Sequence, residues 1–176
     1  MQRHLFLTGD IQVGKSTIIS RVLAELDVPV SGFLTVAVPD AEGSSNIFLV
    51  DAQDPVCSEK CRLAHRVPGK MPEVREEVFV AIGIPLLQDA AGPLILMDEL
   101  GWMESSSYAF QQAVFAVLDE DVPVLGVVRD KRLAFLNAVR DHHAVEVLVV
   151  TRENREEMVD VVRERVLRAM RDTRGT

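Results

Sequence analysis

The feature that most constrains the fold is a glycine-rich segment near residue 10, placed between a strand-like run and a helix-like run. Residues 9–16 read GDIQVGKS and fit the pattern G-x-x-x-x-G-K-S/T. The apolar run at 3–8 predicts a buried strand before this segment, and residues 16–26 carry apolar side chains at helical spacing after it. A strand, a glycine-rich loop and a helix in this order predict the first unit of an α/β sheet.

The residue types in this segment are those that hold a phosphate chain. Gly9 and Gly14 allow backbone N–H groups to converge on an anion. Lys15 brings a positive charge to the β- and γ-phosphates, and Ser16 offers a hydroxyl to Mg²⁺. The positive end of the following helix adds to the attraction. We therefore expect these residues to bind a nucleoside triphosphate: Gly9, Asp10, Ile11, Gln12, Val13, Gly14, Lys15, Ser16 and Thr17.

Beyond this loop, buried strands alternate with amphipathic helices. Apolar runs predict three further buried strands, at 94–97, 123–128 and 145–150. Helical spacing of apolar residues predicts three further helices, at 108–118, 133–139 and 153–170. This alternation predicts an α/β fold of three layers, in which a mainly parallel sheet is covered by helices on both faces. No linker divides the sequence, so we expect a single domain over residues 1–176.

The segment between the first helix and the strand at 94–97 departs from this alternation. Runs at 32–38 and 46–50 flank a loop rich in turn-forming residues and predict an antiparallel hairpin. The polar region after the hairpin predicts a loop, with at most a short strand near residues 61–65. The helix predicted next is broken or restarted at Gly83 and Pro85.

Composition and charge exclude several classes of protein. Hydrophobic residues make up 48% of the 176 residues and charged residues 26%, which excludes a disordered or fibrous chain. The longest apolar run, 78–87, is too short for a membrane helix, and no signal peptide is recognisable. The formal charge of −8 repels nucleic acid, so neither a membrane nor a nucleic acid is an expected partner. Cys57 and Cys61 are expected to be free thiols in a cytoplasmic protein.

Two carboxylates follow the apolar run at 94–97. A triphosphate with Mg²⁺ requires a carboxylate at the tip of a neighbouring buried strand, and Asp98 is in that position. We expect Asp98 to hold the metal together with Ser16. Glu99 is placed to accept a proton from a water molecule that attacks the γ-phosphate, with a surface ion pair as the alternative. Glu99 and Lys15 are therefore the main catalytic candidates, and the arrangement favours hydrolysis over transfer to a bound acceptor.

The same strand end carries a family resemblance. DELGWME at 98–104, followed by Phe110, resembles the D-E-I/L-G-x-M-E…F pattern of the small P-loop nucleoside-triphosphatase family, which includes the cancer-related nucleoside-triphosphatase. Three further segments are similar to segments of that family: GFLT at 32–35, IPLL at 84–87 and VTRENR at 150–155. The resemblance is collinear and covers nearly the whole chain.

The resemblance implies a RecA-like sheet with an added hairpin. It also implies Mg²⁺-dependent hydrolysis of nucleoside 5′-triphosphates, ATP and GTP among them, to diphosphate and phosphate. The chain departs from the family at Ile11 and Gln12, where Pro-Gly is usual, and in its hairpin, which lacks two family arginines. An arginine at the γ-phosphate is worth on the order of 10³ to 10⁵ in turnover. We therefore expect slow hydrolysis unless Arg129 or Arg66 replaces those arginines.

Four other residues are weaker candidates. Arg129 ends the strand predicted at 123–128, where a polar group can sense the γ-phosphate and serve catalysis; a surface ion pair with Asp130 is the alternative. Thr151 and Asn154 follow the last predicted strand, on the side where such sheets bind ligands, and are candidates for contact with base or ribose. Asn154 can instead cap the last helix. Trp102 can stack on a base or contact a partner.

Two other functions fit parts of the pattern. A small-molecule kinase would need an arginine-rich lid, for which the loop before residue 76 offers only Arg62, Arg66 and Arg75. A nucleotide-gated binding protein with negligible turnover is consistent with the missing hairpin arginines, and it would act on an unknown protein partner. A weak homo-oligomer is a further expectation. A GTP-specific switch is disfavoured because no N-K-x-D motif is present.

Overall fold

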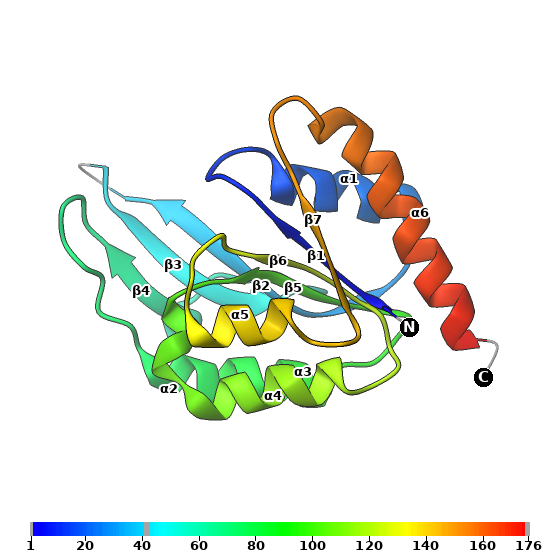
Figure 1. Ribbon diagram of the computed structural model, residues 1–176. Coiled ribbons are helices and arrows are strands. Elements are labelled where there is room, and N and C mark those ends of the chain that lie inside the picture. Colours follow the sequence, from blue (N-terminus) through cyan, green and yellow to red (C-terminus); the bar gives the residue numbers. More distant parts are fainter. Residues whose placement is uncertain (1, 41–42, 175–176) are drawn as a thin grey trace.

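The computed structural model describes residues 2–40 and 43–174, and these form a seven-stranded sheet with helices on both faces (Figure 1). The strands are β1 (His4–Thr8), β2 (Val30–Pro39), β3 (Ser45–Asp51), β4 (Arg62–Arg66), β5 (Leu94–Leu100), β6 (Val124–Val128) and β7 (Val145–Val149). The longer helices are α1 (Lys15–Leu26), α4 (Tyr108–Leu118), α5 (Ala134–Arg140) and α6 (Arg155–Arg174). A composite helix before β5 consists of α2 (Glu76–Val78), the π-helical turn η3 (Phe79–Gly83) and α3 (Ile84–Gln88).

The strand order is β4-β3-β2-β5-β6-β1-β7. Five strands, β2, β5, β6, β1 and β7, are parallel to one another. Strand β6 lies between β1 and β5, with Leu125 opposite both Leu5 and Leu96. Because parallel strands end at the same edge of a sheet, the loops that follow β1, β5 and β6 meet there. The topology thus brings the glycine-rich loop and the acidic strand end together.

The predicted hairpin is confirmed and is longer than expected. Strand β2 pairs antiparallel with β3, from Phe33 opposite Asp51 to Pro39 opposite Ser45. Strand β4, the short strand expected near residues 61–65, pairs antiparallel with β3 and ends the sheet on that side. The predicted α/β fold, with a mainly parallel sheet and an added antiparallel hairpin, is therefore confirmed.

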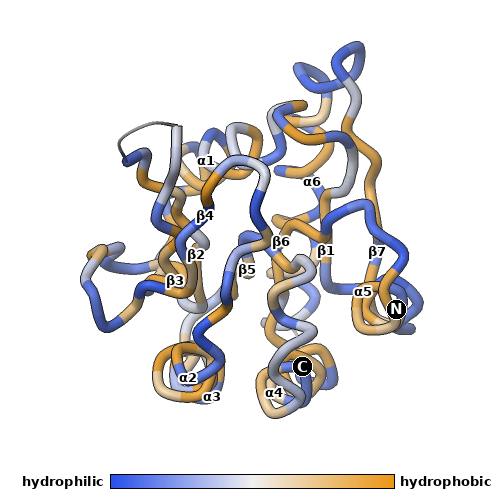
Figure 2. The backbone as a smooth tube through the Cα atoms, turned by 90° about the vertical axis from the view of Figure 1, so that its left-hand side faces the viewer, coloured by the Kyte–Doolittle hydropathy of each residue, from blue (hydrophilic) through white to orange (hydrophobic). Residues whose placement is uncertain are grey.

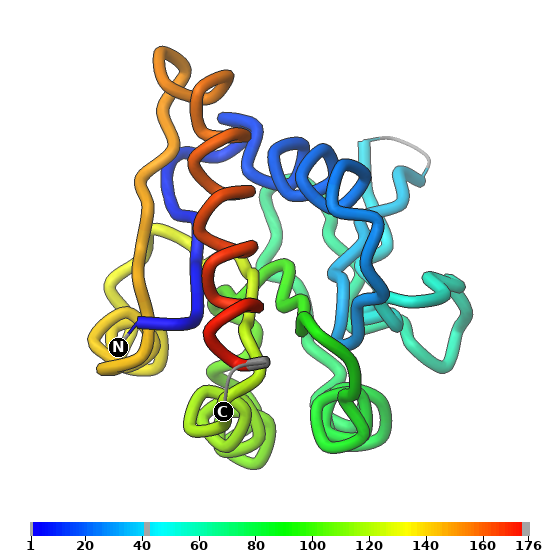
Figure 3. Tube along the Cα trace, turned by 90° about the vertical axis from the view of Figure 1, so that its right-hand side faces the viewer, coloured from blue at the N-terminus to red at the C-terminus, as the bar shows by residue number. Residues whose placement is uncertain are grey.

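The two faces of the sheet bury separate sets of apolar side chains. Along β1, Leu5 and Leu7 face α1 and α6, whereas Phe6 faces the opposite helices. This alternation is the period of two that a strand imposes on its side chains. Figures 2 and 3 show α1 and α6 together on one face, and α3, α4 and α5 on the other. Each face therefore has its own hydrophobic core.

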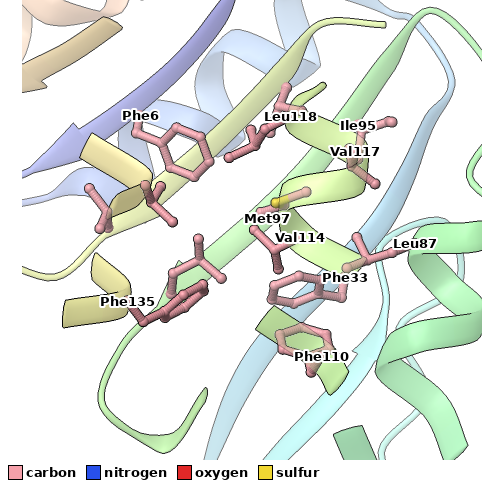
Figure 4. Close-up of a cluster of buried hydrophobic side chains, with 14 of the residues drawn as sticks. Phe6, Phe33, Leu87, Ile95, Met97, Phe110, Val114, Val117, Leu118 and Phe135 are labelled. Carbon is pink, nitrogen blue, oxygen red and sulfur yellow. The ribbon is translucent and has the colours of Figure 1, made fainter. Parts of the chain in front are cut away.

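Phenylalanine rings pack among aliphatic side chains in the core beneath α4 (Figure 4). Phe110 of α4 packs edge-on against Phe33 of β2, with ring centroids 5.5 Å apart, and against Phe79 at 4.7 Å. Helix α4 has the bounds that apolar spacing predicts, because its buried residues repeat at helical intervals: Phe110, Val114, Val117 and Leu118. Burying apolar surface of this kind stabilises a fold by about 25 cal/mol per Å².

The restart expected at Gly83 and Pro85 is confirmed, because the π-helical turn ends at Gly83 and α3 begins at Ile84 with Pro85 in its first turn. The helical path runs from Glu76 to Gln88, because the wider turn of η3 precedes Pro85, which stands in the first turn of α3 and needs no amide donor there. Gly83 also has a role in packing. A Cβ atom at residue 83 would lie 2.6 Å from a ring carbon of Phe110, so the glycine permits close packing of this helix on α4.

Candidate functional site

The glycine-rich loop leaves β1 and enters α1 with a backbone that requires its glycines. Gly9 has φ +133° and packs so closely on the chain after β7 that an added Cβ would lie 2.3 Å from the carbonyl oxygen of Val150. Gly14, at φ +111°, is the residue before the first turn of α1. Any larger residue at these two positions would be strained. Gly9 therefore packs against the end of the sheet, and the N–H groups of the loop are free of helix bonds.

A cavity of about 560 Å³ opens over this loop and fits the size range of small-ligand sites. All the predicted loop residues line it except Val13, which is buried instead. Glu99 and Arg129 line the cavity from the ends of β5 and β6. Two further lining residues, Asp130 and Lys131, were missed from the sequence, because no motif marks them.

Lys15 is buried, and its ammonium group is satisfied by the loop itself. Its Nζ donates to the carbonyl oxygens of Gly9 at 2.8 Å and Asp10 at 2.6 Å. Burial lowers the pKa of Lys15, the nearby charge of Arg129 lowers it further, and Glu99 opposes both. The lysine thus carries a charge that the surrounding protein only partly compensates, and phosphate oxygens would compensate it fully.

Ser16 and Asp98 meet beside the loop. The hydroxyl of Ser16 donates to Oδ1 of Asp98 over 3.4 Å. Burial raises the pKa of Asp98 to about 6, with a smaller contribution from Glu99, whereas the bond from Ser16 and the charge of Lys15 lower it. A hydroxyl and a carboxylate are oxygen ligands of the kind that Mg²⁺ prefers, and a cation would offset the cost of burying the Asp98 charge. The donor set therefore fits Mg²⁺.

The residues that the structure describes do not form a site that would hold a metal by protein ligands alone. Within residues 2–40 and 43–174, no three His, Cys, Asp or Glu side chains converge as metal ligands. Cys61 is buried and bonded to its own turn, while Cys57 is exposed, and both are free thiols, as predicted. Mg²⁺ needs only one or two protein oxygens when it also binds phosphates and water, so this finding agrees with the Ser16–Asp98 pair.

Glu99 and Arg129 form an ion pair at the cavity wall. The guanidinium Nε of Arg129 donates to Oε1 of Glu99, and both side chains are partly exposed. The backbone holds them in register, because the N–H of Arg129 donates to the carbonyl of Leu100 at 2.9 Å. Arg129 pairs with Glu99 rather than with Asp130, and it stays within the cavity. The candidate base and the candidate phosphate sensor therefore neutralise each other in this structure.

A buried carboxyl, Glu104, lies behind this ion pair and was missed from the sequence. Its Oε2 accepts the N–H of Gly101 at 2.7 Å, and its Oε1 has no hydrogen-bond partner among the described residues. Burial raises the pKa of Glu104 to about 7, and the charge of Arg129 opposes part of this shift. The only signal for it was its place in DELGWME at 98–104.

Four of the predicted candidates lie outside the cavity wall. Thr151 and Asn154 bond to each other in the turn before α6, because the Thr151 N–H donates to Oδ1 of Asn154 at 2.8 Å and the Asn154 N–H donates to Oγ1 of Thr151 at 3.2 Å. They do not line the cavity, so contact with a base stays a prediction. Arg66, on β4, donates to Ser45 at 3.2 Å and is also absent from the cavity wall, as is Trp102.

Comparison with known proteins identifies the family. Residues 4–163 match the family model described as NTPase. A mouse protein named "Cancer-related nucleoside-triphosphatase homolog" is 34% identical over 92% of this chain and 96% of its own length. The solution structure of the human cancer-related nucleoside triphosphatase has a TM-score of 0.71 and 30% identity over 91% of this chain and 95% of its own.

A second solved structure extends the similarity of the fold. The crystal structure of THEP1 from Aquifex aeolicus has a TM-score of 0.73 and 19% identity, over 90% of this chain and 96% of that one. Among the described residues, no helix has the length and apolar character needed to span a membrane.

The chain belongs to the NTPase family, the small P-loop nucleoside-triphosphatases that its acidic strand end resembles.

Proposed function

We propose that this protein hydrolyses nucleoside 5′-triphosphates, ATP and GTP among them, to the diphosphate and phosphate. The observation that carries the proposal is a single cavity walled by Lys15, Glu99 and Arg129 and bordered by the Ser16–Asp98 pair. These groups supply a phosphate-binding charge, a base and a metal site from three different strand ends. The names of the relatives support the same reaction class.

Ser16 and Asp98 would hold Mg²⁺ in this proposal. When bound, the ion would neutralise charge on the β- and γ-phosphate oxygens. Lys15 would exchange the carbonyls of Gly9 and Asp10 for phosphate oxygens, at little cost because its burial is already in place. The loop N–H groups would hold the rest of the chain of phosphates.

Glu99 would act as the base once Arg129 leaves it. The γ-phosphoryl group is a stronger acceptor for a guanidinium than one carboxylate, so it would draw Arg129 away and free Glu99 for water. A water proton would pass to Glu99 as the water oxygen bonds to γ-phosphorus. The bond from that phosphorus to the bridging oxygen would break, and the diphosphate would leave with the electron pair.

The ion pair also supports slow turnover. Each cycle must first separate Arg129 from Glu99, and only a bound triphosphate provides the replacement charge. Arg129 is the arginine in the cavity, whereas Arg66 is not, so Arg129 alone would take the place of the missing hairpin arginines. A cytoplasmic location, a single domain and a protein partner or weak homo-oligomer stay predictions from the sequence.

The structure gives no specific support for a kinase. A phosphate-transfer lid would need free arginines over the cavity, but Arg62 and Arg75 both pair with Glu59 and Arg66 bonds to Ser45. Phosphate release separates the functions. We expect free phosphate from ATP, GTP, CTP and UTP with Mg²⁺ and without an added acceptor, and little phosphate without Mg²⁺.

Two variants control the assay. Lys15→Ala should abolish triphosphate binding, whereas Glu99→Gln should bind normally and lose turnover. Phosphate release that depends on an added acceptor would favour the kinase. Stoichiometric binding with no release over hours would favour the binding protein. Either outcome would refute the hydrolase.

A further inference from the structure

Part of the cavity wall is formed by the segment 129–131, directly after β6. Arg129 and Lys131 both line the cavity, with Asp130 between them. The segment belongs to no helix or strand, and loops of this kind are mobile unless something holds them. What holds this one is a side chain from the last turn of α5.

Arg140 binds the backbone of this segment with both ends of its guanidinium group. Its Nη2 donates to the carbonyl of Arg129 and, at 3.1 Å, to the carbonyl of Lys131. Its Nη1 donates to the same Lys131 carbonyl at 3.2 Å and to Oδ1 of Asn137 at 3.0 Å. The N–H of Lys131 also donates to the carbonyl of Arg129 at 2.8 Å, which closes the turn. A planar group with several donors in fixed geometry thus holds both carbonyls.

Lys131 differs from the other two cations of the cavity. Lys15 is bonded to loop carbonyls and Arg129 to Glu99, so neither charge is free before a substrate binds. Within the part of the chain that the structure describes, the ammonium group of Lys131 makes no hydrogen bond or ion pair, and it is exposed at the wall. It is therefore the cation most available to an arriving triphosphate, and Asp130 beside it carries the opposing charge.

We infer that Lys131 contacts the triphosphate and that Arg140 is a positioning residue, which holds the segment 129–131 so that Arg129 and Lys131 face the phosphates. The inference rests on the proposed hydrolase function and extends it to two residues outside the glycine-rich loop and the acidic strand end. Arg140 touches no substrate in this scheme; its effect passes through the carbonyls of residues 129 and 131.

The two roles predict different kinetic changes. Without Arg140, the carbonyls of residues 129 and 131 lose their hydrogen-bond donors, and Arg129 is displaced from the transferring phosphate. Misplacement of a catalytic group reduces turnover by about 10- to 100-fold. Binding should change little, because the glycine-rich loop remains intact. Without Lys131, an exposed charge is lost and binding of the triphosphate should weaken by about threefold.

The experiment compares Arg140→Ala, Arg140→Lys, Lys131→Ala and Arg132→Ala. Arg132 is the matched control, because it is an exposed cation next to Lys131 that does not line the cavity. We would measure kcat for ATP hydrolysis, the Kd of a non-hydrolysable ATP analogue with Mg²⁺, and the thermal unfolding temperature. We expect Arg140→Ala to lower kcat by at least about tenfold at constant Kd, and Arg140→Lys to recover part of it.

Several results would overturn the inference. One is a kcat for Arg140→Ala within about twofold of the parent value per folded molecule. Another is a lower unfolding temperature with kcat and Kd unchanged, which would show a purely structural role. A third is equal analogue binding by Lys131→Ala and the parent protein. If the parent protein binds the analogue but releases no phosphate, the hydrolase proposal fails, whereas the analogue Kd of Lys131→Ala still tests the contact.

Discussion

The hydroxyl of Ser16 lies 3.4 Å from Oδ1 of Asp98, although 82 positions separate the two residues in the sequence. Their contact follows from the sheet. Ser16 is in the first turn of α1 after β1, Asp98 is on β5, and only β6 lies between these two strands. Two motifs that can each be recognised alone become one oxygen-donor site because parallel strands end together.

This pair predicts a shared dependence on Mg²⁺. Asp98→Asn should raise the Mg²⁺ concentration needed for half-maximal phosphate release by at least about tenfold, since it removes the charged ligand. Ser16→Ala should have a smaller effect. The double variant should resemble Asp98→Asn, because both changes act on the same ion. Titrations of MgCl₂ at fixed ATP measure this concentration for the two single variants and the double variant. Strictly additive effects would show that Ser16 and Asp98 do not bind the same ion.

Removing either member of the Glu99–Arg129 pair should lower kcat, and the cause differs between the two residues. Glu99→Gln should lower kcat by about 10² or more and leave binding intact, because only the proton acceptor is lost. Arg129→Ala should lower kcat by on the order of 10³, since it removes charge stabilisation at the γ-phosphate. Single-turnover assays at saturating ATP measure both. A faster Arg129→Ala enzyme would instead show that the ion pair only restrains Glu99.

The fold was predictable because its elements carry strong local patterns. The glycine-rich loop is contiguous, so its geometry and its flanking strand and helix follow from one segment, and residues 108–118 form a helix with the predicted bounds. The restart at Gly83 was predictable because the glycine and proline signals are local, whereas the close approach of Gly83 to the ring of Phe110 on another helix was not. Periodicity carries no information on such a contact.

The site was only partly predictable for the same reason. Lys131 and Arg140 belong to no motif, and only tertiary structure places one at the cavity and the other behind it. Thr151 and Asn154 follow the correct strand end, but their side chains bond to each other's backbone and, for Asn154, to the carbonyl of Val149. Local hydrogen bonds of this kind compete with any bond to a ligand.

His4 predicts a loss of stability in mild acid. It is buried on β1, where its Nε2–H donates to the carbonyl of Leu118 at 3.0 Å and its Nδ1 accepts the N–H of Val124 at 3.2 Å. Burial lowers the pKa of His4 from 6.5 to about 4, because the charged ring would lose its hydration; the bond to Leu118 opposes this shift, and the charge of Arg3 adds to it.

The sign follows from proton binding. Between pH 6.5 and 4 the unfolded chain binds a proton at residue 4 and the folded chain does not, so the free energy of unfolding falls as the pH falls through this range. The full effect is about 3 kcal/mol. Urea unfolding at pH 7, 5.5 and 4.5 measures it, with His4→Gln as the control that cannot titrate. An equal pH dependence in His4→Gln would refute the assignment.

Gly83 predicts a conflict between helix propensity and packing. Alanine is favoured over glycine in a helix by about 1 kcal/mol, so propensity alone predicts that Gly83→Ala stabilises the protein. The added Cβ, however, would lie 2.6 Å from Cε2 of Phe110 and 3.0 Å from Cδ2 of Leu49. Both neighbours are fully buried, so neither can move aside freely.

Overpacking of this kind costs about 1 to 3 kcal/mol, which exceeds the gain in propensity, and we expect Gly83→Ala to be destabilising. Phe110→Leu removes the ring edge that the Cβ would meet. In the Phe110→Leu background, Gly83→Ala should therefore cost less, and the difference measured by urea unfolding is the energy of the clash. If Gly83→Ala instead stabilises the parent protein, the composite helix and α4 can separate enough to admit the Cβ, and the predicted clash with Phe110 does not occur.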